Sequence, residues 1–345
     1  MEPYHNALAK ELVYYAQKTT QTLQSIYLGG GTPSTYPSHL LLDLSDILRS
    51  TYQVSPSAEI TIEVNPGTIT EEKINSWFIG DINRISLGVQ SLNDQVLRLL
   101  NRHHSRNDTI NALKSLSPKF NNISIDLMIG LPGISRAEWQ HMLHEVVSWP
   151  ITHISLYMLT LHHKTPLCFM LKKNALTLPD EEEICSTYQW SFEFLAQHGF
   201  GWYELSNFAK VGYESRHNWA YWKHKSYQGL GISAASFDGK RRYRNTKELA
   251  KYLQNPVDAI EYQETLSKKE LLEEHIMLSI RTKEGISDAS IHAYGGNPDT
   301  LLYKSFIQEL LQNSLIKQHN NSWFLTPKGM CVEHEISQRI MNTVA

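Results

Sequence analysis

Three consecutive glycines follow a short apolar run near the start of the chain. Residues 25–36 have the sequence SIYLGGGTPSTY, so that Gly30, Gly31 and Thr32 come directly after a predicted strand. Glycine adopts positive φ angles and lets backbone N–H groups approach a ligand closely. The stretch is neither a dinucleotide-binding G-x-G-x-x-G motif nor a P-loop, because no Gly-Lys-Ser/Thr follows it. It predicts either a ligand-binding loop or a tight turn that needs glycine for its geometry alone.

Polar residues also end three further strand-like runs. Glu63 ends TIEV, Gln90 follows SLGV, and Asp126 lies within SIDLMIGLPG. Because the carboxyl ends of parallel strands meet at one edge of a sheet, these side chains and the glycine loop are expected to share a ligand site. Carboxylates accept hydrogen bonds from ammonium groups or ribose hydroxyls, and glutamine both donates and accepts. Any one of them alone is more often a capping residue, whereas the four positions together favour a binding site.

Arg102, in LLNRHH, is a weaker candidate. Its guanidinium could bind a carboxylate through two parallel hydrogen bonds. The alternative is a solvated cation that interacts with the dipole at a helix C-terminus, and for an isolated arginine that alternative is favoured. The two histidine pairs at 103–104 and 162–163 are expected at the surface, since adjacent side chains cannot face one site in regular structure.

An aromatic stretch near residue 220 is the last candidate. In RHNWAYW, His217 stands beside Trp219, Tyr221 and Trp222. Such surroundings suit a flat macrocycle, and histidine is a common ligand of haem iron. The alternative is an aromatic wedge that packs two parts of the chain together. Composition alone favours the wedge.

Alternating strands and helices must position these residues. Strands are predicted at 25–30, 58–66, 82–89, 121–130 and 152–159, and helices at 1–16, 38–50, 70–78, 92–100, 107–116 and 135–149. This alternation predicts a parallel sheet with helices outside it, as a barrel or an open sheet. Runs such as ISIDLMIG suggest strands that are apolar on both faces. Because the pattern begins with a helix, one strand is expected to be absent upstream of Met1.

Changes in composition predict three parts of the chain. Residues 1–180 would form the partial β/α barrel, and 181–265 an aromatic, glycine-rich α+β extension. Residues 266–345 contain three helical patterns and a short hairpin around HNNSW, which is a winged-helix-like organisation.

Bulk composition excludes several classes of function. The 345 residues carry a formal net charge of -3, with 41% hydrophobic and 19% charged residues, which is ordinary for a globular protein. No stretch is apolar enough to span a membrane and no export signal is visible, so a cytoplasmic location is expected. From Lys268 to Ala345, 8 Lys and Arg face 9 Asp and Glu, a poor footprint for nucleic acid.

The candidate motifs occur in a recognisable order: YLGGGTPS, EVNP, RISLGVQS, LLNRHH, IDLMIGLPG, YELSNFA, HNWAYW and GLGISAASF. In this order they resemble the radical S-adenosylmethionine (SAM) proteins of the oxygen-independent coproporphyrinogen III oxidase-like family. The resemblance is greatest to its HemW-type haem chaperone branch and covers nearly the whole chain. It implies an α/β fold: an incomplete parallel (β/α)6-type barrel without its first strand, an α+β extension and a C-terminal winged-helix-like segment.

The resemblance also implies roles for single residues at the glycine loop. Gly30, Gly31 and Thr32 match the segment that holds the amino group and methionine portion of SAM. Glu63 matches an acid that engages the same amino group.

Four further residues match family positions. Gln90 and Arg102 match residues that grip the carboxylate and sugar portions of SAM, and Asp126 matches a strand-end acid near it. His217 matches the first residue of the H-N-x-x-Y-W motif of the chaperone branch, which is linked to haem handling. His217 is therefore a candidate haem contact.

One departure from the family concerns the iron–sulfur cluster. Family members begin with a strand and a C-x-x-x-C-x-x-C loop whose thiolates hold a [4Fe–4S] cluster, and SAM chelates its fourth iron. The cysteines of this chain are Cys168, Cys185 and Cys331, which are far apart, and no metal ligands are predicted. The chain as given is therefore not expected to cleave SAM reductively. A start codon assigned too late is favoured over a degenerate member, because the SAM-side residues are intact.

Two functions follow from the resemblance. The first is a haem chaperone that binds haem and delivers it to an acceptor protein, which can be membrane-associated. No catalytic residue is assigned for this function. The alternative is an oxygen-independent coproporphyrinogen III dehydrogenase of porphyrin biosynthesis, which is an oxidoreductase. The H-N-x-x-Y-W signature favours the chaperone, and enzymatic activity is left open.

Overall fold

The computed structural model describes residues 1–173 and 175–344, which form two compact units. The first unit combines Met1–Ile26, Pro37–Glu59 and Ser215–Ala345, and the second combines Tyr27–Tyr36 with Ile60–Glu214. These units are discontinuous in sequence because two strands, Leu23–Leu28 and Val54–Val64, each run from one unit into the other. The linear three-part division at residues 180 and 265 stays a prediction.

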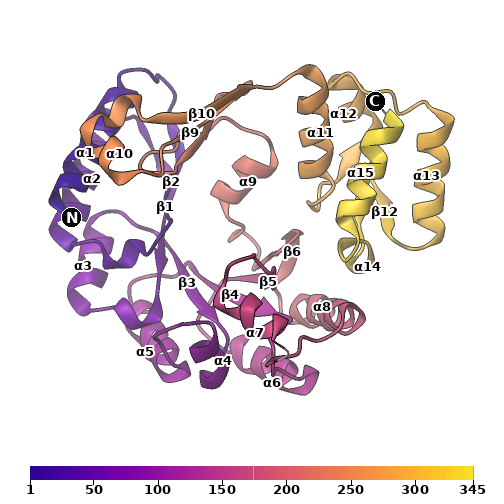
Figure 1. Cartoon of the computed structure of the whole chain (residues 1–345), viewed down its shortest axis with the longest axis horizontal. Helices are drawn as coiled ribbons and strands as arrows, with labels where there is room; N and C mark the ends of the chain where they lie inside the picture. The colour runs from indigo at the N-terminus through magenta and orange to yellow at the C-terminus, as the bar shows by residue number, and fades with distance from the viewer. Residues whose placement is uncertain (174, 345) are drawn as a thin grey trace. The chain divides into compact units, whose positions relative to one another are not determined.

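The largest sheet of the described residues has seven strands, several of which are labelled in Figure 1. Its strands are β1 (Leu23–Leu28), β2 (Val54–Val64), β3 (Arg84–Gln90), β4 (Ile123–Ile129), β5 (His153–Met158), β6 (Gly201–Glu204) and β7 (Asn207–Ala209). Their order is β1-β2-β3-β4-β5-β7-β6, with β1 at one edge. The pairs β2–β3, β3–β4 and β4–β5 are parallel, whereas β7 is antiparallel to β5 and β6. The predicted α/β class with a curled, mostly parallel half-barrel is confirmed.

Helices connect the parallel strands in the predicted alternation. They are α2 (Ser38–Thr51), α3 (Glu71–Ile79), α4 (Asp94–Leu99), α5 (Arg106–Leu116), α6 (Arg136–Val146) and, before β6, α8 (Glu181–Gln197). Local sequence sets where they begin. Ser105 and Ser135 each form a capping box with the acid three residues later, and the Thr70 side chain caps α3.

The two faces of the sheet differ in polarity. In β4, the side chains of Ile123, Ile125 and Leu127 are buried, and each contributes roughly 1.5–3 kcal/mol of burial free energy. Ser124 and Asp126 point to the opposite face, because side chains alternate along a strand. Ser124 is buried as completely as Ile123, so this strand is covered on both faces, as the run ISIDLMIG predicts. Its second face is nevertheless mostly polar, since Met128 is the apolar residue that accompanies Ser124 and Asp126 there.

The first unit carries α1 (Glu2–Ala16) and the antiparallel sheet β10-β9-β8, formed by β8 (Ala235–Phe237), β9 (Arg241–Asn245) and β10 (Ile260–Thr265). The carboxylate of Glu11 in α1 is fully buried. It accepts hydrogen bonds from Gly231 N at 2.8 Å, Asn245 Nδ2 at 2.6 Å and the Tyr252 hydroxyl at 2.6 Å. These bonds fasten α1 to the glycine-rich stretch and to α10 (Leu249–Gln254), and burial raises the pKa of Glu11.

The C-terminal part of the first unit consists of helices and a small three-stranded sheet, the kinds of element expected from its sequence. It contains α11 (Lys268–Ser279), α12 (Asp288–Ala293), α13 (Leu301–Gln312), α14 (Pro327–Met330) and α15 (Glu333–Val344). Its small sheet has the order β11-β13-β12, from β11 (Ile286–Ser287), β13 (Ser322–Leu325) and β12 (Ile316–His319). Arg281 pairs with both carboxylate oxygens of Glu333 at 2.8 and 2.7 Å. None of the helices in the described ranges is long and apolar enough to cross a lipid bilayer.

Candidate functional site

The glycine loop begins where β1 ends. Gly30 and Gly31 have φ angles of +81° and +64°, which side-chain-bearing residues rarely adopt, and space around both is open. Gly29 has a different reason to be glycine, because a Cβ atom there would lie 2.6 Å from the ring of Tyr27. The loop therefore combines one glycine required by packing with two that expose their backbone.

Glu63 at the end of β2 holds this loop in place. Its Oε2 accepts a hydrogen bond from Gly30 N at 3.0 Å, and its Oε1 accepts one from the Tyr27 hydroxyl at 2.9 Å. Ser34, in the short 3-10 helix η1 (Pro33–Thr35), is buried, and its Oγ accepts a hydrogen bond from Asn65 N at 3.1 Å. The segments that follow β1 and β2 are thus joined at the carboxyl edge of the sheet.

A row of polar side chains continues from Glu63 across the sheet. Glu63 pairs in register with Ser86 of β3, and the Ser86 hydroxyl donates to Asp126 Oδ2 of β4 at 3.4 Å. Burial raises the pKa of Asp126 to about 6, although a hydrogen bond from Ser155 and the charge of Arg84 act in the opposite direction. The structure therefore brings Gly30, Glu63 and Asp126 to one face and one edge of the sheet.

Arg84 is a buried cation on this polar face that the sequence did not single out. It stands opposite Thr61 of β2 in the parallel register and two residues before Ser86. Within the described part of the chain, its Nε has no hydrogen-bond partner. Its charge nevertheless acts on two neighbours. It opposes the rise that burial causes in the pKa of Asp126, and it adds to the effect of burial in lowering the pKa of His153. Arg84 is therefore the counter-charge of the carboxylates on this face.

Gln90 ends β3 in an unusual conformation. Its φ is +66°, in the left-handed region that a glutamine seldom occupies, and only 8% of the residue is exposed. Backbone strain of this kind costs roughly 1–3 kcal/mol and clusters at functional sites. Gln90 lies at the carboxyl edge, next to Leu127 of β4 in register.

Arg102 lies in the loop between α4 and α5, twelve residues after Gln90. Its backbone N donates to Leu97 O at 2.8 Å, and its side chain is half-buried. No described residue forms a hydrogen bond or ion pair with its guanidinium. Arg102 is thus available to an external anion, but the structure shows no direct contact between it and the Glu63–Asp126 row.

The expectation that both histidine pairs lie at the surface is wrong for His104. His104 is buried, and its Nε2 lies 3.1 Å from the carbonyl oxygen of Val89, which precedes Gln90. A turn between Arg102 and α5 directs this side chain inward, and burial lowers its pKa. His103, His162 and His163 are exposed as predicted.

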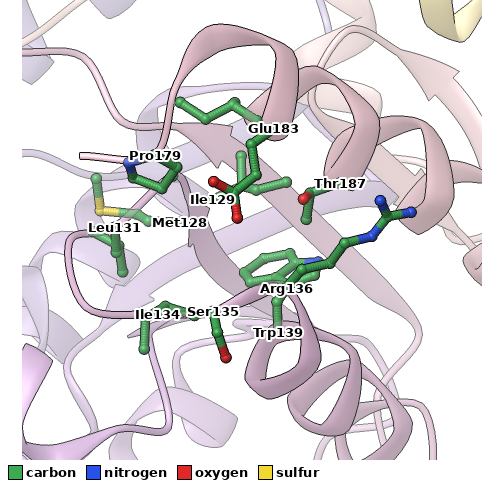
Figure 2. A pocket seen from close by; sticks show the side chains of 12 residues that line it. Met128, Ile129, Leu131, Ile134, Ser135, Arg136, Trp139, Pro179, Glu183 and Thr187 are labelled. Atoms are coloured by element: carbon green, nitrogen blue, oxygen red, sulfur yellow. The ribbon is translucent and has the colours of Figure 1, made fainter.

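A small, partly open cavity lies beside the turn after β4. Figure 2 shows its lining, which includes Met128, Trp139 and Glu183. Its volume of about 20 Å³ suffices for one water molecule and is far too small for a nucleoside. This cavity is therefore not the candidate SAM site, which rests on the polar side chains and the glycine loop at the carboxyl edge.

His217 belongs to the first unit and lies in α9 (Arg216–Trp222). Its Nδ1 lies 3.0 Å from Ser25 Oγ of β1, and its Nε2 lies 3.2 Å from the Tyr221 hydroxyl. The rings of His217 and Tyr221 meet edge to face, with centroids 4.8 Å apart. Both ring nitrogens are therefore held, and the imidazole orientation is fixed.

Glu59 of β2 holds the start of α9. Its buried carboxylate accepts hydrogen bonds from the Ser215 hydroxyl, Arg216 N and His217 N, each at 3.0 Å. Sequence reasoning missed Glu59 and Ser25. The alternation in AEITIEV, which puts Glu59 and Glu63 on one face of one strand, was the only available signal for Glu59.

The residues present differ in how well they fit the two cofactors of the resembled family. The exposed backbone of the glycine loop and the two carboxylates suit the ammonium and hydroxyl groups of SAM. In residues 1–173 and 175–344, however, no three His, Cys, Asp or Glu side chains converge to hold a metal ion, and Cys168 is a buried free thiol. These residues do not fit a [4Fe–4S] cluster.

Comparisons with known proteins agree with the motif order. The profile of the Radical SAM superfamily matches residues 2–146, and that of the HemN C-terminal domain matches residues 266–332. The chain is 31% identical to the heme chaperone HemW of Bacillus subtilis over 97% of this chain and 90% of that protein. It is 35% identical to heme chaperone HemW of Synechocystis, over 84% and 71% of the two chains.

A similar relative occurs in cattle, and a similar fold is known from a bacterial enzyme. The chain is 31% identical to the mitochondrial radical S-adenosyl methionine domain-containing protein 1 of Bos taurus, over 94% of this chain and 78% of that one. Coproporphyrinogen III oxidase (HemN) from Escherichia coli, a radical SAM enzyme, superposes with a TM-score of 0.79. That match covers 98% and 82% of the two chains at 22% identity, and it shows the shared fold alone.

Proposed function

The chain belongs to the radical SAM superfamily and, within it, to the family of the haem chaperone HemW, and from this we propose that it binds haem and delivers it to acceptor proteins. A cytoplasmic location is part of the proposal. The alternative, a coproporphyrinogen III dehydrogenase, is supported by the shared fold and by the match to the HemN C-terminal domain, whereas the relatives at 31–35% identity cited above for HemW are haem chaperones.

The observation that carries the proposal is the fixed imidazole of His217. In the tautomer in which Nδ1–H donates to Ser25 Oγ, Nε2 is unprotonated and accepts a hydrogen bond from the Tyr221 hydroxyl. A ligating histidine usually donates its other ring N–H in this way, which orients the ring and raises its basicity. Haem iron would replace only the Tyr221 hydroxyl at Nε2.

A second part of the proposal concerns SAM. Glu63 and the backbone of Gly30 and Gly31 would bind its ammonium group, and Asp126 would accept hydrogen bonds from its hydroxyls. The remaining proposed contacts are Thr32, Gln90 and Arg102. In other members of the family, the iron–sulfur cluster supplies the electron for SAM cleavage. The residues named here would only bind and orient SAM.

The test is a hemin titration of the full chain, followed by the Soret band. Wild type is expected to shift this band from its position in free hemin, and His217→Ala is expected to weaken binding at least tenfold. His319→Ala, an exposed histidine in β12 of the same unit, is the matched control and is expected to bind as wild type. If the spectrum of wild type with hemin remains that of free hemin, the proposal is refuted. An anaerobic assay that forms protoporphyrinogen would favour the dehydrogenase instead.

A further inference from the structure

The segment that follows β5 exposes a run of large apolar side chains. Tyr157 is 44% and Met158 37% exposed at the end of the strand, and Leu161 is 40% exposed shortly after it. In α7 (Pro166–Lys172), Phe169 is 55% and Met170 36% exposed. Tyr157 and Met158 are neighbours in β5, so their side chains point to opposite faces of the sheet, and Tyr157 lies on the face of Asp126. Single exposed apolar residues are common, whereas several within one short segment are a candidate interaction surface.

The charges of this segment have one sign. Residues 157–173 contain Lys164, Lys172 and Lys173, together with His162 and His163, and no Asp or Glu. All three lysines are exposed, and none of them forms an ion pair with a described residue. The segment thus offers an apolar surface bordered by free cations and hydrogen-bond donors.

Hydrogen bonds define the conformation of this segment. Leu159 N donates to Ile129 O at 3.0 Å, which holds the chain beside the end of β4. The Thr165 hydroxyl donates to His162 O at 2.8 Å, and Cys168 N donates to Thr165 Oγ1 at 3.4 Å. Buried Cys168 anchors α7, and Lys164 adopts the left-handed φ of +75°. The turn therefore holds its basic residues outward on a fixed backbone.

We propose that residues 157–173, the β5–α7 segment, form a docking surface for the porphyrin macrocycle of haem, whose two propionate carboxylates pair with the lysines. The occupant must be broad, apolar and doubly anionic, and these are the properties of a porphyrin dicarboxylate. The choice of haem rests on the proposed function, whereas the surface itself belongs to the second unit and does not involve His217.

The position of the segment supports a role next to the candidate SAM site. Tyr157 and Met158 pair in register with Met128 and Ile129, so that they lie just beyond Asp126 on the neighbouring strand. The ring of Tyr157 is partly exposed, whereas burial around its hydroxyl and, second, the carboxylate of Asp126 raise the pKa of Tyr157, so the two groups lie within electrostatic range. The start of the β5–α7 segment and the carboxyl end of β4 are thus neighbours in the second unit.

The experiment uses iron-free protoporphyrin IX, which removes iron ligation by any histidine. Binding to the full chain is followed by porphyrin fluorescence. Phe169→Glu is expected to weaken binding about tenfold, because an aromatic contact of roughly 1.5 kcal/mol or more is lost. Lys172→Glu with Lys173→Glu is expected to weaken it about fivefold at low salt and less at high salt. Val211→Glu changes a residue that is 94% exposed elsewhere in the same unit and serves as the matched control.

Blocking the propionates isolates the charge term. The dimethyl ester of protoporphyrin IX is expected to bind wild type and the double lysine variant equally. Wild-type binding with no loss in either variant would overturn the docking surface and leave haem binding through His217 intact. The same conclusion follows if wild type binds hemin but not protoporphyrin IX. If wild type binds neither, the proposed function fails and the docking surface fails with it.

Discussion

Glu59 offers the sharpest test of how the fold prepares His217. Its carboxylate, on β2, accepts three hydrogen bonds at the start of α9, from residues 156 to 158 positions later in the chain. Replacement by alanine leaves two backbone N–H groups and one hydroxyl without their acceptor. The ring of His217 would then lose the support of the helix that carries it.

The size of the effect follows from these contacts. A buried donor left unsatisfied costs about 1–3 kcal/mol, and loss of a helix cap costs about 0.5–2 kcal/mol. Glu59→Ala is therefore expected to destabilise the first unit by about 3–5 kcal/mol. Glu59→Gln keeps one carbonyl acceptor and is expected to cost only about 1–2 kcal/mol.

Urea unfolding and hemin titration together measure both consequences. Glu335→Ala, an exposed glutamate of α15 in the same unit, is the control and should leave stability and affinity unchanged. If Glu59→Ala does not fold, Glu59→Gln still shows a smaller loss of both quantities. If both Glu59 variants have the same stability and the same hemin affinity as wild type, the role assigned to Glu59 is refuted.

Three further changes test other parts of the site. Tyr221→Phe removes the hydroxyl that occupies His217 Nε2, so hemin affinity should rise several-fold; a fall would contradict the assigned ring orientation. Asp126 has a folded pKa of about 6 against 3.8, so its ionisation costs stability as pH rises through that window. The melting temperature of Asp126→Asn minus that of wild type should therefore increase from pH 4 to pH 6 and stay constant above pH 6. A difference that does not depend on pH would argue against this. Gly31→Val, at φ +64°, should reduce SAM retention in equilibrium dialysis, whereas unchanged retention would remove the loop from the site.

Local sequence pattern was sufficient for the sheet and its carboxyl edge. Strand–helix alternation places Glu63, Gln90 and Asp126 near strand ends, and parallel pairing brings those ends to one edge. Burial on both faces of β4 was predicted, but the polarity of one face was not. Ser124 and Asp126 interrupt the apolar run at alternate positions, and that interruption is the sequence signal of a mostly polar face.

Long-range contacts could not be predicted from the sequence in the same way. The bonds from Glu59 to α9 and from Ser25 to His217 join residues 156 or more positions apart, and no local pattern encodes them. His104 was placed at the surface because the turn that directs it toward Val89 depends on the segments packed around it. Arg84 has an ordinary position in β3, and its importance follows only from the carboxylates that surround it.

Pulsed electron paramagnetic resonance of the hemin-loaded full chain, with 15N-labelled histidine, tests most directly whether His217 binds haem iron. We predict a 15N imidazole coupling to ferric iron that is present in wild type and His319→Ala and absent in His217→Ala. A coupling that persists unchanged in His217→Ala would contradict the proposed ligand.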